Sequence, residues 1–253
     1  MRVLVTFAVD AEFAPWRKLR NLRQTKVGDI VVNQAQIGRA LVDFVVTGMG
    51  AENAARVANA FMIEPYTICI AAGFAGALKP DYSIGTVLVA EGVQQLGSSK
   101  TLMGSRNLAH AARDDGAKMT KLLTSDHVVR TIEEKAQLAP FAGAVDMESF
   151  AILAAAAAHN RPAVAIRVIS DANDGEIPAF VDAMLDDKGK ISAANALREV
   201  SRHPLQLPAL IRLGRDSRTA AEALANFLEA FVKKLSLSSH GWPPPELQEV
   251  ASR

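Results

Sequence analysis

Two acidic residues at the ends of two apolar segments offer the most specific chemistry in this sequence. Glu148 lies two residues before the small-residue segment Phe150 to Ala158, and Asp171 lies two residues after the segment Ala163 to Ile169. An aspartate in a crevice at a strand end can hold a proton near neutrality and act as a general acid. A carboxylate in a first helical turn is either a ligand group or a structural cap, so both residues have to be judged with the elements around them.

The chain between these two acids predicts a helix followed by a strand. Phe150 to Ala158 has high helix propensity and little bulk, so it can pack close to a sheet. Asn160 and Pro162 disfavour its continuation, and Ala163 to Ile169 is rich in the β-branched residues that favour a buried strand. Asp171 then lies at the carboxyl end of that strand, which is where ligands bind in open α/β sheets.

The first part of the chain adds two weaker candidates. Arg2 to Ala8 predicts a buried strand, and Glu12 lies in the first turn of the helix that follows, where an acid also suits the helix dipole. Gly48-Met49-Gly50 joins a predicted strand, Ala40 to Thr47, to a predicted helix, Ala51 to Ile63. This turn is a weak phosphate-binding signal because glycines allow close backbone approach and helix amides attract anions. It lacks the third glycine of a dinucleotide fingerprint and the lysine of a P-loop.

Strands alternate with helices after a β-rich start, which predicts a single α/β domain with a mixed, twisted central β-sheet flanked by helices. We expect this domain to span residues 1–235. Residues 177–213 are expected to form an extra helical segment, with breaks that include Pro208, and a long amphipathic helix is expected from Arg215 to Leu235. The tail, 236–253, is rich in proline and is expected to be extended or disordered.

Two short motifs resemble a known family. Val145-Asp146-Met147-Glu148-Ser149 followed by Arg167-Val168-Ile169-Ser170-Asp171 resembles the paired signature of the nucleoside phosphorylase superfamily (purine/uridine phosphorylase family 1). The resemblance is greatest to its nucleosidase branch, the methylthioadenosine/S-adenosylhomocysteine nucleosidases. That branch has Val-Glu-Met-Glu in the first motif, so Asp146 is a departure while Met147 and Glu148 match.

The resemblance implies that the protein is an enzyme that cleaves the N-glycosidic bond of a purine nucleoside. Asp171 would protonate the leaving base, Glu148 would bind the ribose hydroxyls, and Glu12 would orient the attacking water. Met147 would form an apolar floor under the sugar, and Ser170 would help to orient Asp171. General acid help of this kind is worth about a hundred-fold to ten-thousand-fold in rate.

Other parts of the family pattern match less well. Phe74 stands where relatives have a small polar residue near the ribose and the nucleophile. Val128 and Val129 fall in a stretch that resembles the purine-contact segment, although both residues could equally be core. Gly48 to Gly50 matches a family Gly-Ile-Gly, a turn near the nucleophile or phosphate.

Phosphate instead of water is the main alternative nucleophile. Phosphorylases of this superfamily surround the anion with arginines, and the sequence offers only Arg39 or Arg167 together with the turn at Gly48 to Gly50. The segment Arg202 to Leu213 is similar to the same region of hopanoid-associated phosphorylases, which points to an adenosyl compound with a bulky apolar group at the far end of the sugar. A catalytically silent nucleoside-binding protein is a third reading, since binding does not need an acid at Asp171.

Composition limits the kinds of partner. Lys and Arg number 28 against 27 Asp and Glu, a net charge of +1, so there is no electrostatic case for nucleic acid or an anionic membrane as the main partner. The longest apolar run, Phe150 to Ala158, is far shorter than the roughly twenty residues of a membrane span. Cys69 alone forms no intramolecular disulfide, and the N-terminus lacks the features of a signal peptide. We therefore expect a cytoplasmic protein that acts on a small molecule.

The histidines are scattered and show no metal-ligand spacing with a cysteine or an acid. We expect no metal and no cofactor, apart from inorganic phosphate as a co-substrate in the alternative reaction. The resemblance implies a homodimer or a higher homo-oligomer.

Overall fold

A computed structural model describes residues 1–178, 183–184, 192–202 and 204–237. The strands are β1 (Arg2–Phe7), β2 (Arg23–Val27), β3 (Ile30–Ile37), β4 (Ala40–Val46), β5 (Ile68–Ala77), β6 (Val87–Gln95), β7 (Thr101–Leu102), β8 (Lys118–Thr124), β9 (Ala144–Asp146) and β10 (Ala163–Asp171). The helices are α1 (Asp10–Leu19), α2 (Ala51–Met62), α3 (Arg106–Asp114), α4 (Ile132–Leu138), α5 (Ser149–Ala158), α6 (Ala193–Arg202) and α7 (Leu207–Leu237), with a 3-10 turn at Pro204–Gln206.

These strands form one mixed sheet with the order β10-β6-β8-β9-β5-β1-β4-β3-β2, and β7 pairs with β6. An additional pairing of β10 with β5 closes five of the strands into a ring. The predicted strands at Arg2 to Ala8 and Ala163 to Ile169 belong to this same sheet, because β1 and β10 both pair in parallel with β5. The predicted α/β fold with a mixed central sheet is confirmed.

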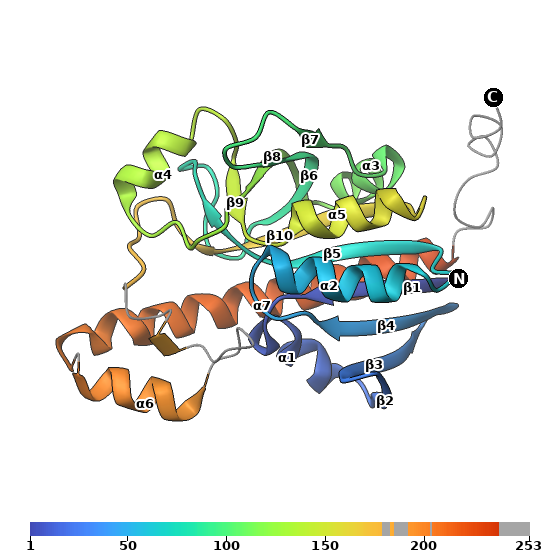
Figure 1. Cartoon of the computed structure of the whole chain (residues 1–253), viewed down its shortest axis with the longest axis horizontal. Coiled ribbons are helices and arrows are strands. Elements are labelled where there is room, and N and C mark those ends of the chain that lie inside the picture. The colour runs from blue at the N-terminus through green and yellow to red at the C-terminus, as the bar shows by residue number, and fades with distance from the viewer. Residues whose placement is uncertain (179–182, 185–191, 203, 238–253) are drawn as a thin grey trace.

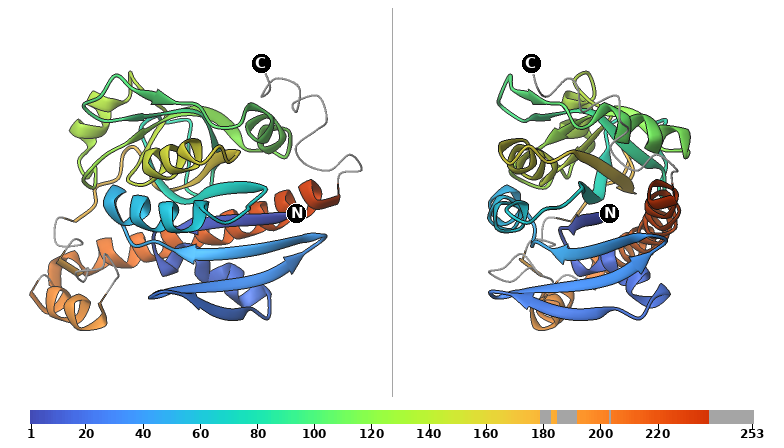
Figure 2. Two further views of the ribbon diagram at one scale, coloured as in Figure 1. Left: turned by 45° about the vertical axis from the view of Figure 1, so that its right-hand side comes forward. Right: turned by 90° about the vertical axis from the view of Figure 1, so that its right-hand side faces the viewer.

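Helices cover both faces of the sheet (Figure 1, Figure 2). Val3, Val5 and Phe7 of β1 pack with residues of α1 and α7, whereas Leu4 packs with residues of α2 and α5. This alternation follows from the two-residue period of a strand. One face of α5 is buried, through Ile152, Leu153, Ala155 and Ala156, whereas Ala157 and Ala158 at its end are exposed.

Several element boundaries differ from those expected from the sequence. Helix α1 carries the basic residues Arg17 and Lys18 in its last turn, and Arg23 begins the exposed edge strand β2. The final helix starts at Leu207 and not at Arg215, because Pro208 lies in its first turn, where a missing backbone N–H costs nothing. The extra segment is therefore helical in α6 and in the start of α7. Residues 238–253 of the expected tail lie outside the described residues.

The long helix α7 carries charged side chains along its length and packs across the domain (Figure 1). Among the helices of the described residues, none combines the length and the apolar character that crossing a bilayer requires.

Candidate active site

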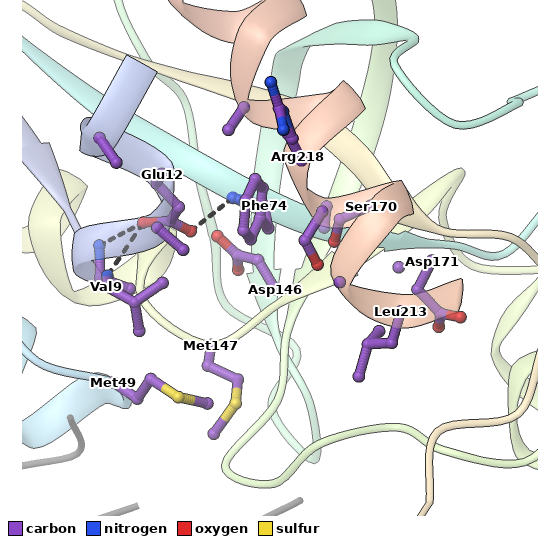
Figure 3. A pocket seen from close by; sticks show the side chains of 18 of the residues that line it. Val9, Glu12, Met49, Phe74, Asp146, Met147, Ser170, Asp171, Leu213 and Arg218 are labelled. Carbon is purple, nitrogen blue, oxygen red and sulfur yellow. Dashed lines mark hydrogen bonds between the residues drawn. The ribbon is translucent and has the colours of Figure 1, made fainter. Parts of the chain in front are cut away.

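The carboxyl ends of β1, β5 and β10 meet at one edge of the sheet, and a cavity of about 870 Å³ opens there. Its lining includes Glu12, Phe74 and Asp171 (Figure 3), together with Glu148, and these residues come from four different parts of the chain. The parallel pairing of the three strands brings these residues together, as the sheet-edge rule for α/β proteins predicts.

Glu12 is held in place by three backbone N–H groups. Its Oε2 accepts from the amides of Ala8 at 2.7 Å and Val9 at 3.1 Å, and its Oε1 accepts from the amide of Phe74 at 2.7 Å. The first two contacts are those of a glutamate that caps its own helix, but the third reaches β5 and is not needed for a cap. Burial raises the pKa of Glu12, while nearby Arg167 and the three amides act in the opposite direction. One of the four lone-pair positions of this carboxylate remains to receive a ligand or water.

Arg167 lies at the centre of the acidic cluster and is fully buried. Its Nη2 is 2.6 Å from Oδ2 of Asp146, its Nη1 is 3.6 Å from Oε2 of Glu148, and its Nε donates to Oγ of Ser149 at 3.0 Å. A side chain at Gly73 would overlap the guanidinium and approach Oε1 of Glu12, so glycine permits this close packing. The one cation thus neutralises only part of the charge of three acids.

Asp146 performs the structural role that the sequence allowed for Glu148. Its Oδ2 accepts from the backbone N–H of Ser149 at 3.0 Å, at the start of α5, and its Oδ1 accepts from Oγ1 of Thr124 at 2.6 Å. Asp146, which stands where the nucleosidase motif has glutamate, therefore pairs with Arg167 and caps the start of α5. Glu148 is left available for another partner.

Glu148 makes no capping bond to α5 and bonds to a different element. Its Oε1 accepts from the backbone N–H of Gly50 at 2.8 Å, at the N-terminus of α2. Burial raises its pKa to about 7, and Arg167 opposes the shift while Asp146 and Glu12 add to it. The turn at Gly48 to Gly50, which the sequence predicted as a weak phosphate-binding turn, therefore uses the backbone N–H of Gly50 to bind the carboxylate of Glu148. Met49 of that turn lines the cavity, whereas Gly48 and Gly50 do not belong to its lining.

Asp171 lies at the other end of the cavity from Glu12 (Figure 3). Its Oδ2 is 2.5 Å from Nζ of Lys135, whose side chain is 1% exposed. Burial raises the pKa of Asp171, and Lys135 lowers it. The predicted partner, Ser170, lines the cavity, but no hydrogen bond joins it to Asp171 among the described residues.

The remaining sequence candidates also reach the cavity. Met147, Phe74, Val128 and Val129 all line it, in the same cavity as Asp171 and Glu148. Arg39 does not reach it, because it follows the turn between β3 and β4, where its backbone N–H bonds to Ser236 at the end of α7.

Helices α1 and α7 form one wall of the cavity, with the apolar side chains of Pro15 and Leu19 on α1 and of Leu210 and Leu213 on α7. Polar side chains of the same two helices, among them Lys18 and Arg218, also line the cavity. Glu229 ties the two helices together by accepting hydrogen bonds from Nε1 of Trp16 at 2.8 Å and from Nε of Arg20 at 3.0 Å. This wall was not predicted, because its two sides are almost two hundred residues apart in the sequence.

No group of three or more histidine, cysteine, aspartate or glutamate side chains suited to a metal ion occurs within the part of the chain that the structure describes. The site instead contains three buried carboxylates around the guanidinium of Arg167, and it also contains Asp171 paired with Lys135. A fold with such a cluster at the carboxyl ends of parallel strands, open to one large cavity, is typical of α/β enzymes that act on small molecules.

Comparisons with known proteins identify the family. Residues 3–202 match the family described as the phosphorylase superfamily. The 5'-methylthioadenosine/S-adenosylhomocysteine nucleosidase of Staphylococcus aureus (strain bovine RF122 / ET3-1) is 24% identical over 206 residues, which cover 71% of this chain and 90% of that protein. The chain belongs to the phosphorylase superfamily and is an enzyme.

Solved structures show the same fold. The 5'-methylthioadenosine/S-adenosyl homocysteine nucleosidase of Helicobacter pylori aligns with a TM-score of 0.73 and 18% identity, over 93% of this chain and 99% of that one. The native futalosine hydrolase of the same species aligns with a TM-score of 0.73 and 18% identity, over 93% and 98% of the two chains.

Proposed function

We propose that this enzyme hydrolyses the N-glycosidic bond of a purine nucleoside of the adenosine type and releases the free base. The environment of Glu12 is the observation that supports water as the nucleophile. The backbone amides of Ala8, Val9 and Phe74 are all bonded to its carboxylate, so the donors that would otherwise hold an anion are already used. The reaction needs no metal or cofactor.

Cleavage of this bond places positive charge on the ribose and negative charge on the leaving base. It therefore needs an acid near the base, a carboxylate near the sugar and a positioned nucleophile. Asp171 supplies the acid, Glu148 accepts hydrogen bonds from the ribose hydroxyls, and Glu12 orients the water. The separation of Glu12 and Asp171 at opposite ends of the cavity supports this division, because the sugar and the base of one nucleoside would lie between them (Figure 3).

Charge around the nucleophile argues against phosphate. Arg167 is the only one of the two proposed phosphate-binding arginines that reaches the site, and it already faces Asp146 and Glu148. A dianion next to these carboxylates and Glu12 would be repelled in a medium of low dielectric constant. A neutral water molecule meets no such penalty.

The size of the cavity supports a nucleoside that carries a substituent at the far end of its ribose. Its volume of about 870 Å³ is near the upper end of the range of roughly 300–1,000 Å³ for ligand pockets. Val128 and Val129 suit an aromatic base, and the apolar side chains of the wall of α1 and α7 suit an apolar group. The same wall favours, as a second candidate, the adenosyl compound with a bulky apolar group that the hopanoid-associated phosphorylases suggest.

The test is release of base from a panel of purine nucleosides by the wild-type protein and by Asp171→Asn. Asparagine keeps the shape and donates a hydrogen bond but transfers no proton, so turnover should fall at least about a hundred-fold, with affinity changed far less. Binding without base release by the wild type would support the silent-binder reading. Full activity of the variant, at unchanged fold by circular dichroism, would show that another group is the acid.

We also infer from the resemblance that the protein is cytoplasmic and forms a homo-oligomer. Light scattering after size-exclusion chromatography at micromolar concentration should give at least a dimeric mass, and a monomeric mass would contradict the inference.

A further inference from the structure

Lys135 is a buried lysine whose ammonium group contacts the proposed acid. It lies on the short helix α4, and its Nζ is 2.5 Å from Oδ2 of Asp171 and donates to the backbone carbonyls of Ala172 and Gly175 at 2.7 Å each. The ammonium therefore donates two hydrogen bonds to backbone carbonyls and contacts the carboxyl group of Asp171 as an ion pair. Lysine is almost never fully buried unless it is paired, so the fold maintains this contact against a desolvation cost.

The surroundings of Asp171 shift the balance between its carboxylate and its protonated form in two opposite directions. Burial between β10, β5 and α7 disfavours the carboxylate, and so do Asp174 in the following loop and Asp216 on α7. Lys135 on α4 favours it. His127 and Arg218 are further charged or titratable residues of the same cavity. The ammonium group thus counteracts an environment that otherwise favours the protonated form of Asp171.

We propose that Lys135 is a positioning residue for proton transfer, which fixes the carboxyl group of Asp171 and stabilises the carboxylate that remains after Asp171 has protonated the leaving base. This inference rests on the proposed function. The O–H bond of Asp171 breaks, an N–H bond forms on the imidazole nitrogen of the purine, and the electrons of the glycosidic bond pass to the base. Lys135 keeps its three protons throughout.

The physical reason is the change of charge during the step. An ammonium group interacts weakly with a neutral carboxyl group and strongly with a carboxylate, so its contribution grows as the proton leaves. The same interaction lowers the pH at which Asp171 loses its proton in the free enzyme. Lys135 therefore increases the rate of the step while limiting activity at alkaline pH.

Lys135→Gln separates charge from structure, because glutamine can still donate to the carbonyls of Ala172 or Gly175. The maximal turnover should fall by about tenfold or more, and the alkaline limb of kcat/KM should move up by at least about one pH unit, the lower end of the effect of a close opposite charge. Gln137→Met, at an exposed position of the same helix, should change neither quantity. A lower turnover with an unmoved alkaline limb would show that Lys135 is only structural.

A second measurement is independent of turnover. The carboxyl carbon of Asp171, labelled with carbon-13 and assigned with Asp171→Asn, should titrate at higher pH in Lys135→Gln than in the wild type, and an equal midpoint would overturn the proposal. If Lys135→Gln does not fold, Lys135→Arg replaces it: the retained charge should leave the alkaline limb within about half a pH unit of wild type, and a larger shift would overturn the proposal. Absence of base release in all forms would refute the proposed function, whereas this titration would still report on the pair.

Discussion

Arg167 and Asp146 form an ion pair from which water is excluded. Nη2 of the arginine is 2.6 Å from Oδ2 of the aspartate, and the two side chains are 1% and 0% exposed. Arg167 also interacts electrostatically with the carboxylates of Glu12 and Glu148. The site therefore depends on one buried cation to keep three acids in a single cluster.

Removal of this cation should destabilise the fold severely. Arg167→Met leaves Asp146 and Glu148 without their partner, and breaking a buried pair costs about 3–5 kcal/mol. The free energy of unfolding, measured with urea, should fall by that amount. Arg113→Met removes an exposed ion pair with Asp114 and should cost about 0–1 kcal/mol. Equal losses for the two variants would contradict the role given to Arg167.

Glu12→Gln should abolish most turnover while substrate affinity is largely kept. The amide cannot accept from Ala8 and Val9 on one side and from Phe74 on the other, because one of its two ends is a donor. A moderate loss of stability, about 1–3 kcal/mol for an unsatisfied buried donor, should accompany the change. Glu64→Gln, which alters a partly exposed pair with Arg2 outside the cavity lining, serves as the control. Turnover within a few-fold of wild type would exclude Glu12 as the residue that orients water.

The raised pKa of Glu148 predicts a pH dependence of stability. The folded pKa is about 7 and the ordinary value is 4.5, so between these values the folded protein binds a proton that the unfolded chain has lost. The free energy of unfolding should therefore fall as pH rises from about 4.5 to about 7. Glu148→Gln should remove this contribution, and Glu133→Gln on the surface should not. A slope that is the same in wild type and Glu148→Gln would contradict the assignment.

The fold and the two principal acids could be predicted because their signals are local. A small-residue helix, a turn with Pro162 and a β-branched strand fix where Glu148 and Asp171 lie along the chain. The pairing of both β9 and β10 with β5 then brings the two acids to the same part of the sheet. Glu12 needed the family resemblance, since a first-turn glutamate is also an ordinary helix feature.

The rest of the site arises from contacts that have no local signal. Lys135 occurs in a polar stretch typical of a surface helix, and only the packing of α4 on the loop after β10 buries it. Arg167 was recognisable as a charge within an otherwise apolar strand, but its acidic partners were not. The wall of α1 and α7 depends on tertiary contacts through Glu229.

The most direct test of the account is the origin of the oxygen on the released sugar. The enzyme is incubated with adenosine-type nucleosides in oxygen-18-labelled water, with and without inorganic phosphate, and the sugar product is identified by mass. We predict free ribose, or its substituted form, that carries one labelled oxygen at the anomeric carbon, at a rate unaffected by phosphate. A sugar phosphate formed only when phosphate is present would contradict hydrolysis and assign the enzyme to the phosphorylases.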